Sequence, residues 1–230
     1  MSGGVSGGDS GRAGGTNLAA LHPDWRAAWG GTIAGKALRA EMEGNPRLHA
    51  RLLTAIAERH DLSVARPPRL DRTGAAVAAA LDEDAEGFVR LCGLARIGHR
   101  LALATNPDDY AALARTFGRG PLVAAARIAA DLPPDEGGHG YDSEQLAPAV
   151  DRMGASVVRE WAEALPRASA EWIAMHMPRD EEEPGGALGT ERARRIVEGA
   201  VKRWPELRAE RERDGGRSDE RRPSRRRRAA

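Results

Sequence analysis

The stretch Asp82–Ala104, which reads DEDAEGFVRLCGLARIGHRLALA, decides the fold class. Its apolar and small residues recur every three or four positions and form one broad stripe, as in a helix that faces a core: Phe88, Leu91, Leu94, Ala95, Gly98 and Leu101. The acidic residues from Asp82 to Glu86 are typical of a helix start, where carboxylates complement the helix dipole. The stretch therefore predicts a core helix that begins near Asp82.

Three glycines interrupt this predicted helix, although each costs about 1 kcal/mol relative to alanine in a helix interior. Gly87, Gly93 and Gly98 are spaced by six and five residues, so they lie on different faces. A single close crossing with one other helix cannot explain all three.

Helical spacing continues on both sides of this segment. Asn45-Pro46 predicts an N-cap and a first-turn proline, and Asn106-Pro107 predicts another helix start, with Gly118 as its end. Further helices are expected to begin at Pro121, Pro148, Pro166 and Thr190. Only Trp172–Met177 alternates well enough to form a short strand instead. We therefore expect an all-α fold, a single multi-helix orthogonal bundle with disordered termini.

Composition divides the chain into three parts. Residues 1–16 are almost entirely Gly and Ser, and they predict a disordered arm. Residues 17–205 are the expected helical domain. Residues 206–230 hold ten arginines and six acidic residues, with Leu207 as the only large apolar side chain, and they predict a disordered tail.

The composition also excludes several classes of protein. The single cysteine, Cys92, excludes a disulfide framework and cysteine-based metal clusters. No apolar run approaches the roughly 20 residues that cross a bilayer, and the first residues lack a secretory signal pattern. We therefore expect a soluble, intracellular protein. Thirty-three of the 35 basic residues are arginine, which we attribute to codon bias rather than to phosphate binding.

No catalytic motif is recognisable. The glycine clusters do not match a phosphate-binding loop, and no serine lies in a nucleophile elbow. His139 and Asp142 lie close in sequence, but no third metal ligand is near them. Cys92 lies on the apolar side of its helix and is interpreted as a small buried hydrophobe. We expect no enzyme activity, no cofactor and no metal.

Two features favour binding to other molecules. Trp25 and Trp29 are four residues apart and share a helix face, and tryptophan is enriched in interface hot spots, although core packing is the more common role. The tail ends in Arg225, Arg226, Arg227 and Arg228, which could contact a polyanion through its charge. Because no aromatic residues are interleaved with these arginines, we expect no specific recognition of nucleic acid.

Several segments, taken in order, resemble one family. His22-Pro23-Asp24-Trp25 is similar to the His-x-x-Trp entry of the SctK-type accessory proteins of bacterial type III secretion, the YscK/OrgA/MxiK group. The leucine-rich helix from Asn45, the segments 88–104 and 106–118, and the pattern Gly154, Trp161, Pro166 and Pro178 resemble the parts that follow in that family. The likeness covers about residues 17–178.

This resemblance implies a non-enzymatic adaptor for protein secretion at the cytoplasmic face of the inner membrane. It would connect an inner-membrane ring protein of the SctD type to pod proteins of the SctQ and SctL types. His22, Trp25 and Trp29 are then the expected partner-binding residues. Two alternatives stay open: a polyanion-binding protein that acts through its basic tail, and a helical enzyme whose site is assembled from distant histidines and acids.

Overall fold

A computed structural model describes residues 22–30, 35, 38, 41, 44–59, 69–102, 107–133, 143–178 and 188–220. Within these ranges the chain is helical and contains no strand, so the predicted all-α bundle is confirmed. The helices are α1 (Pro23–Gly30), α3 (Pro46–Arg59), α4 (Arg72–Arg96), α5 (Gly98–Ala102), α6 (Pro107–Phe117), α7 (Arg119–Ala130), α8 (Ser143–Ala162), α9 (Arg167–Met175) and α10 (Thr190–Glu220).

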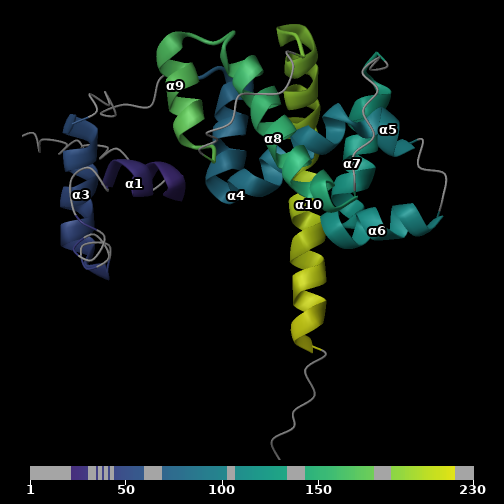
Figure 1. Ribbon diagram of the computed structural model, residues 1–230, viewed down its shortest axis with the longest axis horizontal. Helices are drawn as coiled ribbons and strands as arrows, with labels where there is room; N and C mark the ends of the chain where they lie inside the picture. Colours follow the sequence, from purple (N-terminus) through teal and green to yellow (C-terminus); the bar gives the residue numbers. More distant parts are fainter. Residues whose placement is uncertain are drawn as a thin grey trace, which may run out of the picture.

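The central helix is α4, which packs against α7, α8 and α10 (Figure 1). Its side chains Phe88, Leu91 and Leu94 are fully buried, as the stripe in the sequence predicts. The partner helices contribute apolar residues such as Val157 and Ile196 to the same core. The predicted core helix is therefore confirmed.

Gly87 and Gly93 of α4, and Gly98 at the start of α5, each have different neighbours. A Cβ atom on Gly93 would overlap the carbonyl oxygen of Val150 on α8, and one on Gly98 would lie 2.5 Å from the Cβ of Ala129 on α7. A Cβ atom on Gly87 would lie 3.0 Å from a guanidinium nitrogen of Arg211 on α10. The inference that no single crossing explains all three is confirmed, because Gly93 and Gly98 permit close approaches to two different helices, whereas Gly87 leaves room for the Asp84 carboxylate.

The predicted start of the core helix is correct in part. The helix begins ten residues earlier, at Arg72, where the Asp71 side chain caps it by accepting from the backbone N–H of Gly74 at 2.7 Å. At Asp84, however, the backbone leaves the helical region (φ −158°, ψ 83°), and its carboxylate accepts from the Gly87 N–H at 2.8 Å. The acidic cluster thus caps a second helical segment after a kink.

The far end of this helix was predicted less well. It does not continue to Ala104: α4 ends at Arg96, and α5 is a separate short helix. The break lies at Ile97, whose φ of −97° and ψ of 6° are not helical. This break lets Gly98 approach α7 closely.

Several predicted boundaries are confirmed. The Asn45 side chain accepts from the backbone N–H groups of Arg47 and Leu48, at 3.1 Å and 3.4 Å, as an N-cap does. Helix α6 begins at Pro107 and is followed by Gly118, whose φ of 83° suits glycine.

Other boundaries need correction. Helix α8 begins at Ser143, so Pro148 lies inside it rather than in its first turn, and α7 begins at Arg119 rather than at Pro121. The possible strand at residues 172–177 is instead the last turn of α9 and the turn that follows it.

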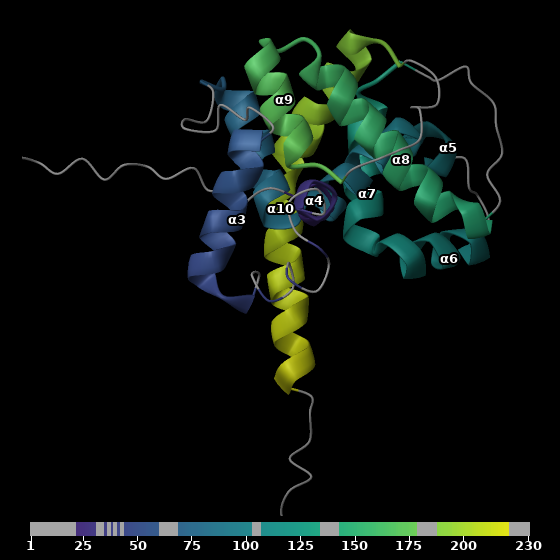
Figure 2. The ribbon, with the colours of Figure 1, turned by 60° about the vertical axis from the view of Figure 1, so that its left-hand side comes forward.

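The predicted boundary between domain and tail at residues 205 and 206 is also corrected, because α10 continues through Pro205 to Glu220. Leu207 is only 5% exposed and belongs to the core. Arg208 and Arg211 reach back to α4, where they pair with Glu83 and Asp84. Only the last turns of α10 extend beyond the bundle (Figure 2). Residues 1–16 and 221–230 lie outside the described residues.

Candidate interaction surface

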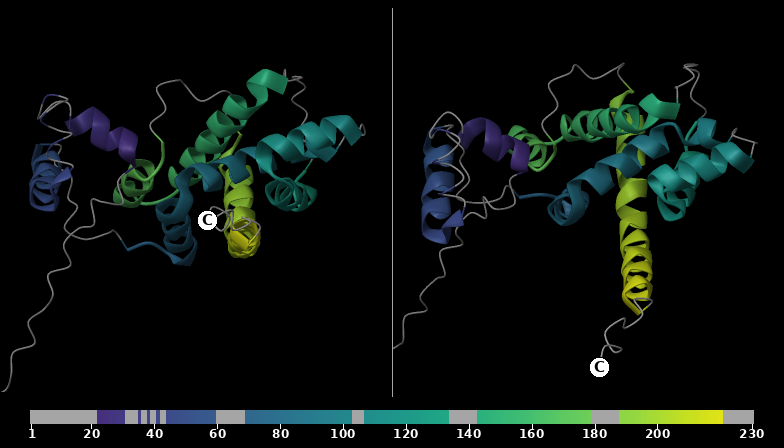
Figure 3. Two further views of the ribbon diagram at one scale, coloured as in Figure 1. Left: turned by 90° about the horizontal axis from the view of Figure 1, so that it is seen from below. Right: turned by 60° about the horizontal axis from the view of Figure 1, so that its bottom comes forward.

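The N-terminal helices form an arm beside the bundle, which we define as residues 22–59. Helix α1 packs against α3 and meets the bundle at the end of α9 (Figure 3). The backbone N–H of His22 donates to the carbonyl oxygen of Met175, and the indole Nε1–H of Trp25 donates to that of Met177, both at 3.1 Å. These carbonyls lie at a helix C-terminus, where they lack partners within the helix. The arm therefore supplies hydrogen-bond donors for two carbonyl oxygens at the C-terminal end of α9.

His176 lies between these two acceptors and is buried, with 5% of its side chain exposed. Its Nδ1 lies 2.7 Å from the carbonyl oxygen of Trp172, one turn earlier in α9. Its ring stacks on the Trp172 ring, with centroids 3.8 Å apart and planes tilted by 35°. The imidazole is thus held in one orientation by its own helix.

The other ring nitrogen of His176 faces α4. Its Nε2 lies 3.4 Å from an oxygen of Asp82, whose side chain is 44% exposed. Burial raises the pKa of Asp82, and the charge of His176 opposes this effect. The contact joins α9 to α4 directly beside the place where the arm is attached.

The structure places two of the predicted partner-binding residues in this contact with the chain's own α9. His22 is 11% exposed, and its Nδ1 lies 3.3 Å from both the backbone nitrogen and a carboxylate oxygen of Asp24. Trp25 is half-buried. Trp29 belongs to α1, but its side chain lies outside the described residues. A contact of these residues with another protein stays a prediction.

The polyanion-binding residues that the sequence predicts, Arg225 to Arg228, also lie outside the described residues. The helix that precedes them is anchored firmly. Trp204 is 7% exposed and packs edge-on against Phe88, with ring centroids 5.4 Å apart, while the Arg211 guanidinium lies 5.5 Å from the Trp204 ring centroid. Aromatic packing thus attaches α10 to α4 just before Pro205, and the cation–π contact joins the two sides of Pro205 within α10.

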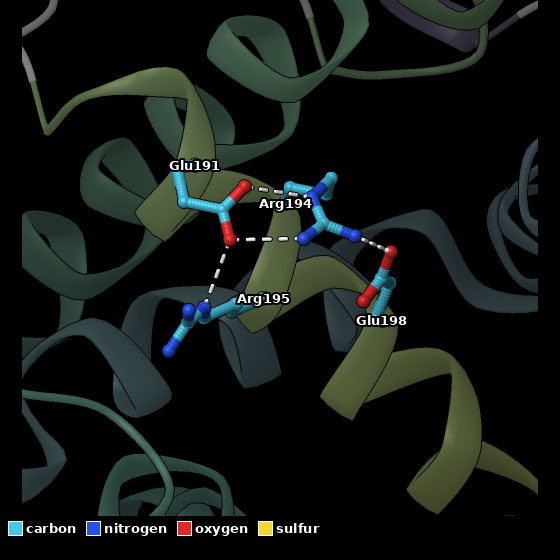
Figure 4. A network of polar contacts seen from close by, with 4 residues as sticks. All are labelled: Glu191, Arg194, Arg195 and Glu198. Atoms are coloured by element: carbon cyan, nitrogen blue, oxygen red, sulfur yellow. Dashed lines mark hydrogen bonds and ion pairs between the residues drawn. The ribbon is translucent and has the colours of Figure 1, made fainter.

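A network of charges lies at the other end of α10 (Figure 4). Glu191 accepts hydrogen bonds from Arg194 and Arg195, which lowers its pKa to about 2, and Arg194 also binds Glu198 at 2.7 Å. These side chains are exposed and are spaced three or four residues apart, so their ion pairs stabilise the helix and do not form a binding site.

The start of α10 is held by a carboxylate from α8. Glu160 accepts hydrogen bonds from the backbone N–H groups of Leu188 and Gly189, at 2.9 Å and 3.0 Å, and from the Ser156 hydroxyl at 3.3 Å. The carboxylate also suits the positive end of the helix dipole. It fixes α10 relative to α8.

The other candidate groups are placed as follows. Cys92 is fully buried, and its burial raises the pKa of the thiol, so its interpretation as a buried hydrophobe is confirmed. His139 and Asp142 lie outside the described residues.

Among the residues that the structure does describe, no three His, Cys, Asp or Glu side chains are grouped to hold a metal ion. No helix in the described ranges has the length and apolar character to span a membrane.

The sequence analysis did not identify His176 and Asp82, the two residues that join α9 to α4 beside the arm. They are 94 positions apart, and no motif links them. One local signal was available: Trp172 and His176 are spaced by four, which places their rings together in a helix.

Comparison with known proteins identifies no relative. No family model matches the chain, no curated protein matches it, and no solved structure matches it.

Proposed function

We propose that this chain is a non-enzymatic adaptor of a bacterial type III secretion system, in the role of an SctK-type protein. It links an inner-membrane ring protein of the SctD type to pod proteins of the SctQ and SctL types, at the cytoplasmic face of the inner membrane. One observation carries the proposal. The two ends of the region that resembles this family, His22–Trp25 and the segment that closes at Pro178, contact each other.

This contact supports the resemblance because both segments take part in it through defined groups. The two residues of the entry motif each contribute one hydrogen bond to the carbonyls before Pro178: His22 through its backbone N–H, and Trp25 through its indole N–H. Trp25 and Met177 are 152 positions apart, and His22 and Met175 are still farther apart in the sequence. A chance similarity of short motifs gives no reason for them to meet.

The arrangement of the helices also suits a connector. The arm lies beside α9, whereas the last turns of α10 extend from a different part of the bundle (Figure 1). A rigid core with two protruding elements can hold two partners apart at a set distance. Tryptophan anchors on the arm and arginines at its rim would supply binding energy and specificity.

Co-purification tests this proposal. The full chain carrying an affinity tag is expressed with the SctD-type cytoplasmic domain and with the SctQ-type and SctL-type proteins of the same bacterium. We expect both the ring domain and the pod proteins to be retained. Retention of neither would overturn the proposal.

Matched variants locate the contact. Trp25→Ala and Trp29→Ala should each reduce retention of one partner class about tenfold or more, because a hot-spot residue contributes about 2 kcal/mol. Tyr110→Ala is the control, since Tyr110 is an exposed aromatic on α6, away from the arm. An equal loss of partner retention in Tyr110→Ala would show that the arm is not the binding surface.

A polyanion-binding role for the tail is the second candidate, and α10 favours it. Helix α10 ends at Glu220, and its last turns extend beyond the other helices (Figure 2). In this role Arg225 to Arg228 would bind phosphates through charge alone, with an affinity that depends strongly on salt.

A further inference from the structure

We draw no further inference here: the strongest candidate, the exposed surface of α6 and α7 that carries Tyr110 and Val123, supports no proposal because nothing in the described part of the chain shows what covers this apolar face.

Discussion

Gly93 of α4 and Gly154 of α8 face each other where these two helices cross. A Cβ atom on either glycine would lie 3.0 Å from the backbone nitrogen of the other. Each would also overlap a carbonyl oxygen of the facing helix, that of Val150 or that of Val89. The two backbones can approach this closely only because both positions lack a side chain.

Substitution of this pair should therefore destabilise the whole fold. We expect Gly93→Ala and Gly154→Ala each to lower the free energy of unfolding by about 2–3 kcal/mol, because the added methyl group meets backbone that cannot move aside locally. Urea denaturation followed by circular dichroism measures this change.

Gly44→Ala is the control for this prediction, since nothing lies within 4 Å of its Cβ position. That variant should be neutral or gain up to about 1 kcal/mol through the lower entropy of its unfolded chain. Equal effects at Gly44 and Gly93 would show that helix propensity, not the crossing, is responsible.

The second half of α10 should contribute to the stability of the core. Leu207 is buried against the bundle beyond Pro205, so we expect Leu207→Ala to cost about 2–4 kcal/mol. Truncation after Pro205 should lower the melting temperature, whereas truncation after Glu220 should not. Lys202→Ala, at an exposed position of the same helix, is the matched control. A chain ending at Pro205 with unchanged stability would restore the domain boundary predicted from the sequence.

The charge network at the start of α10 should be visible in the titration of Glu191. Hydrogen bonds from Arg194 and Arg195 lower its pKa to about 2 from the ordinary value of 4.5. Because the folded pKa is the lower one, the stabilisation is present above pH 4.5 and is lost as the pH falls towards 2.

Carboxyl-detected NMR titration measures this pKa directly. In Arg194→Gln the pKa of Glu191 should rise towards 4.5, and added salt should reduce the difference because these groups are exposed. Arg127→Gln, on α7, should leave the titration unchanged. A Glu191 pKa near 4.5 in the natural chain would mean that the network does not persist in solution.

The tail should bind polyanions through charge without sequence preference. We expect affinity for heparin or duplex DNA to fall steeply between about 50 and 200 mM salt, and to be lost when Arg225, Arg226, Arg227 and Arg228 are replaced by glutamine. Fluorescence anisotropy measures both effects. Replacement of Arg194 and Arg195 by glutamine is the control, because it removes two arginines elsewhere. Binding that survives the tail substitutions would eliminate this role for the tail.

Much of the fold was predictable from local patterns. The spacing of Phe88, Leu91 and Leu94 indicates the buried face of α4 before any partner is known, because a helix repeats every 3.6 residues. Asn45 and Gly118 mark helix ends through cap chemistry that involves only neighbouring residues. Cys92 was correctly interpreted from its apolar neighbours.

Predicted helix boundaries were wrong where local residue chemistry favoured a helix end but contacts with other helices extended the helix. Arginine-rich composition and Pro205 indicate a solvated tail, but Leu207 is buried in the core, and Arg208 and Arg211 pair with carboxylates of α4. The acidic residues before Gly87 do cap a helix, yet Ala-rich residues upstream extend it to Arg72, because α4 is held in the core on both sides of its kink.

The sequence by itself determined that the chain is helical, where most of its helices end and which residues face the core, since these properties depend on residues within a few positions of one another. Only the tertiary structure decided that His176 faces Asp82, that Trp25 binds the carbonyl of Met177, and that Gly93 meets Gly154. Each of those contacts joins residues more than 60 positions apart, and such pairing depends on how whole helices cross, which no local pattern encodes.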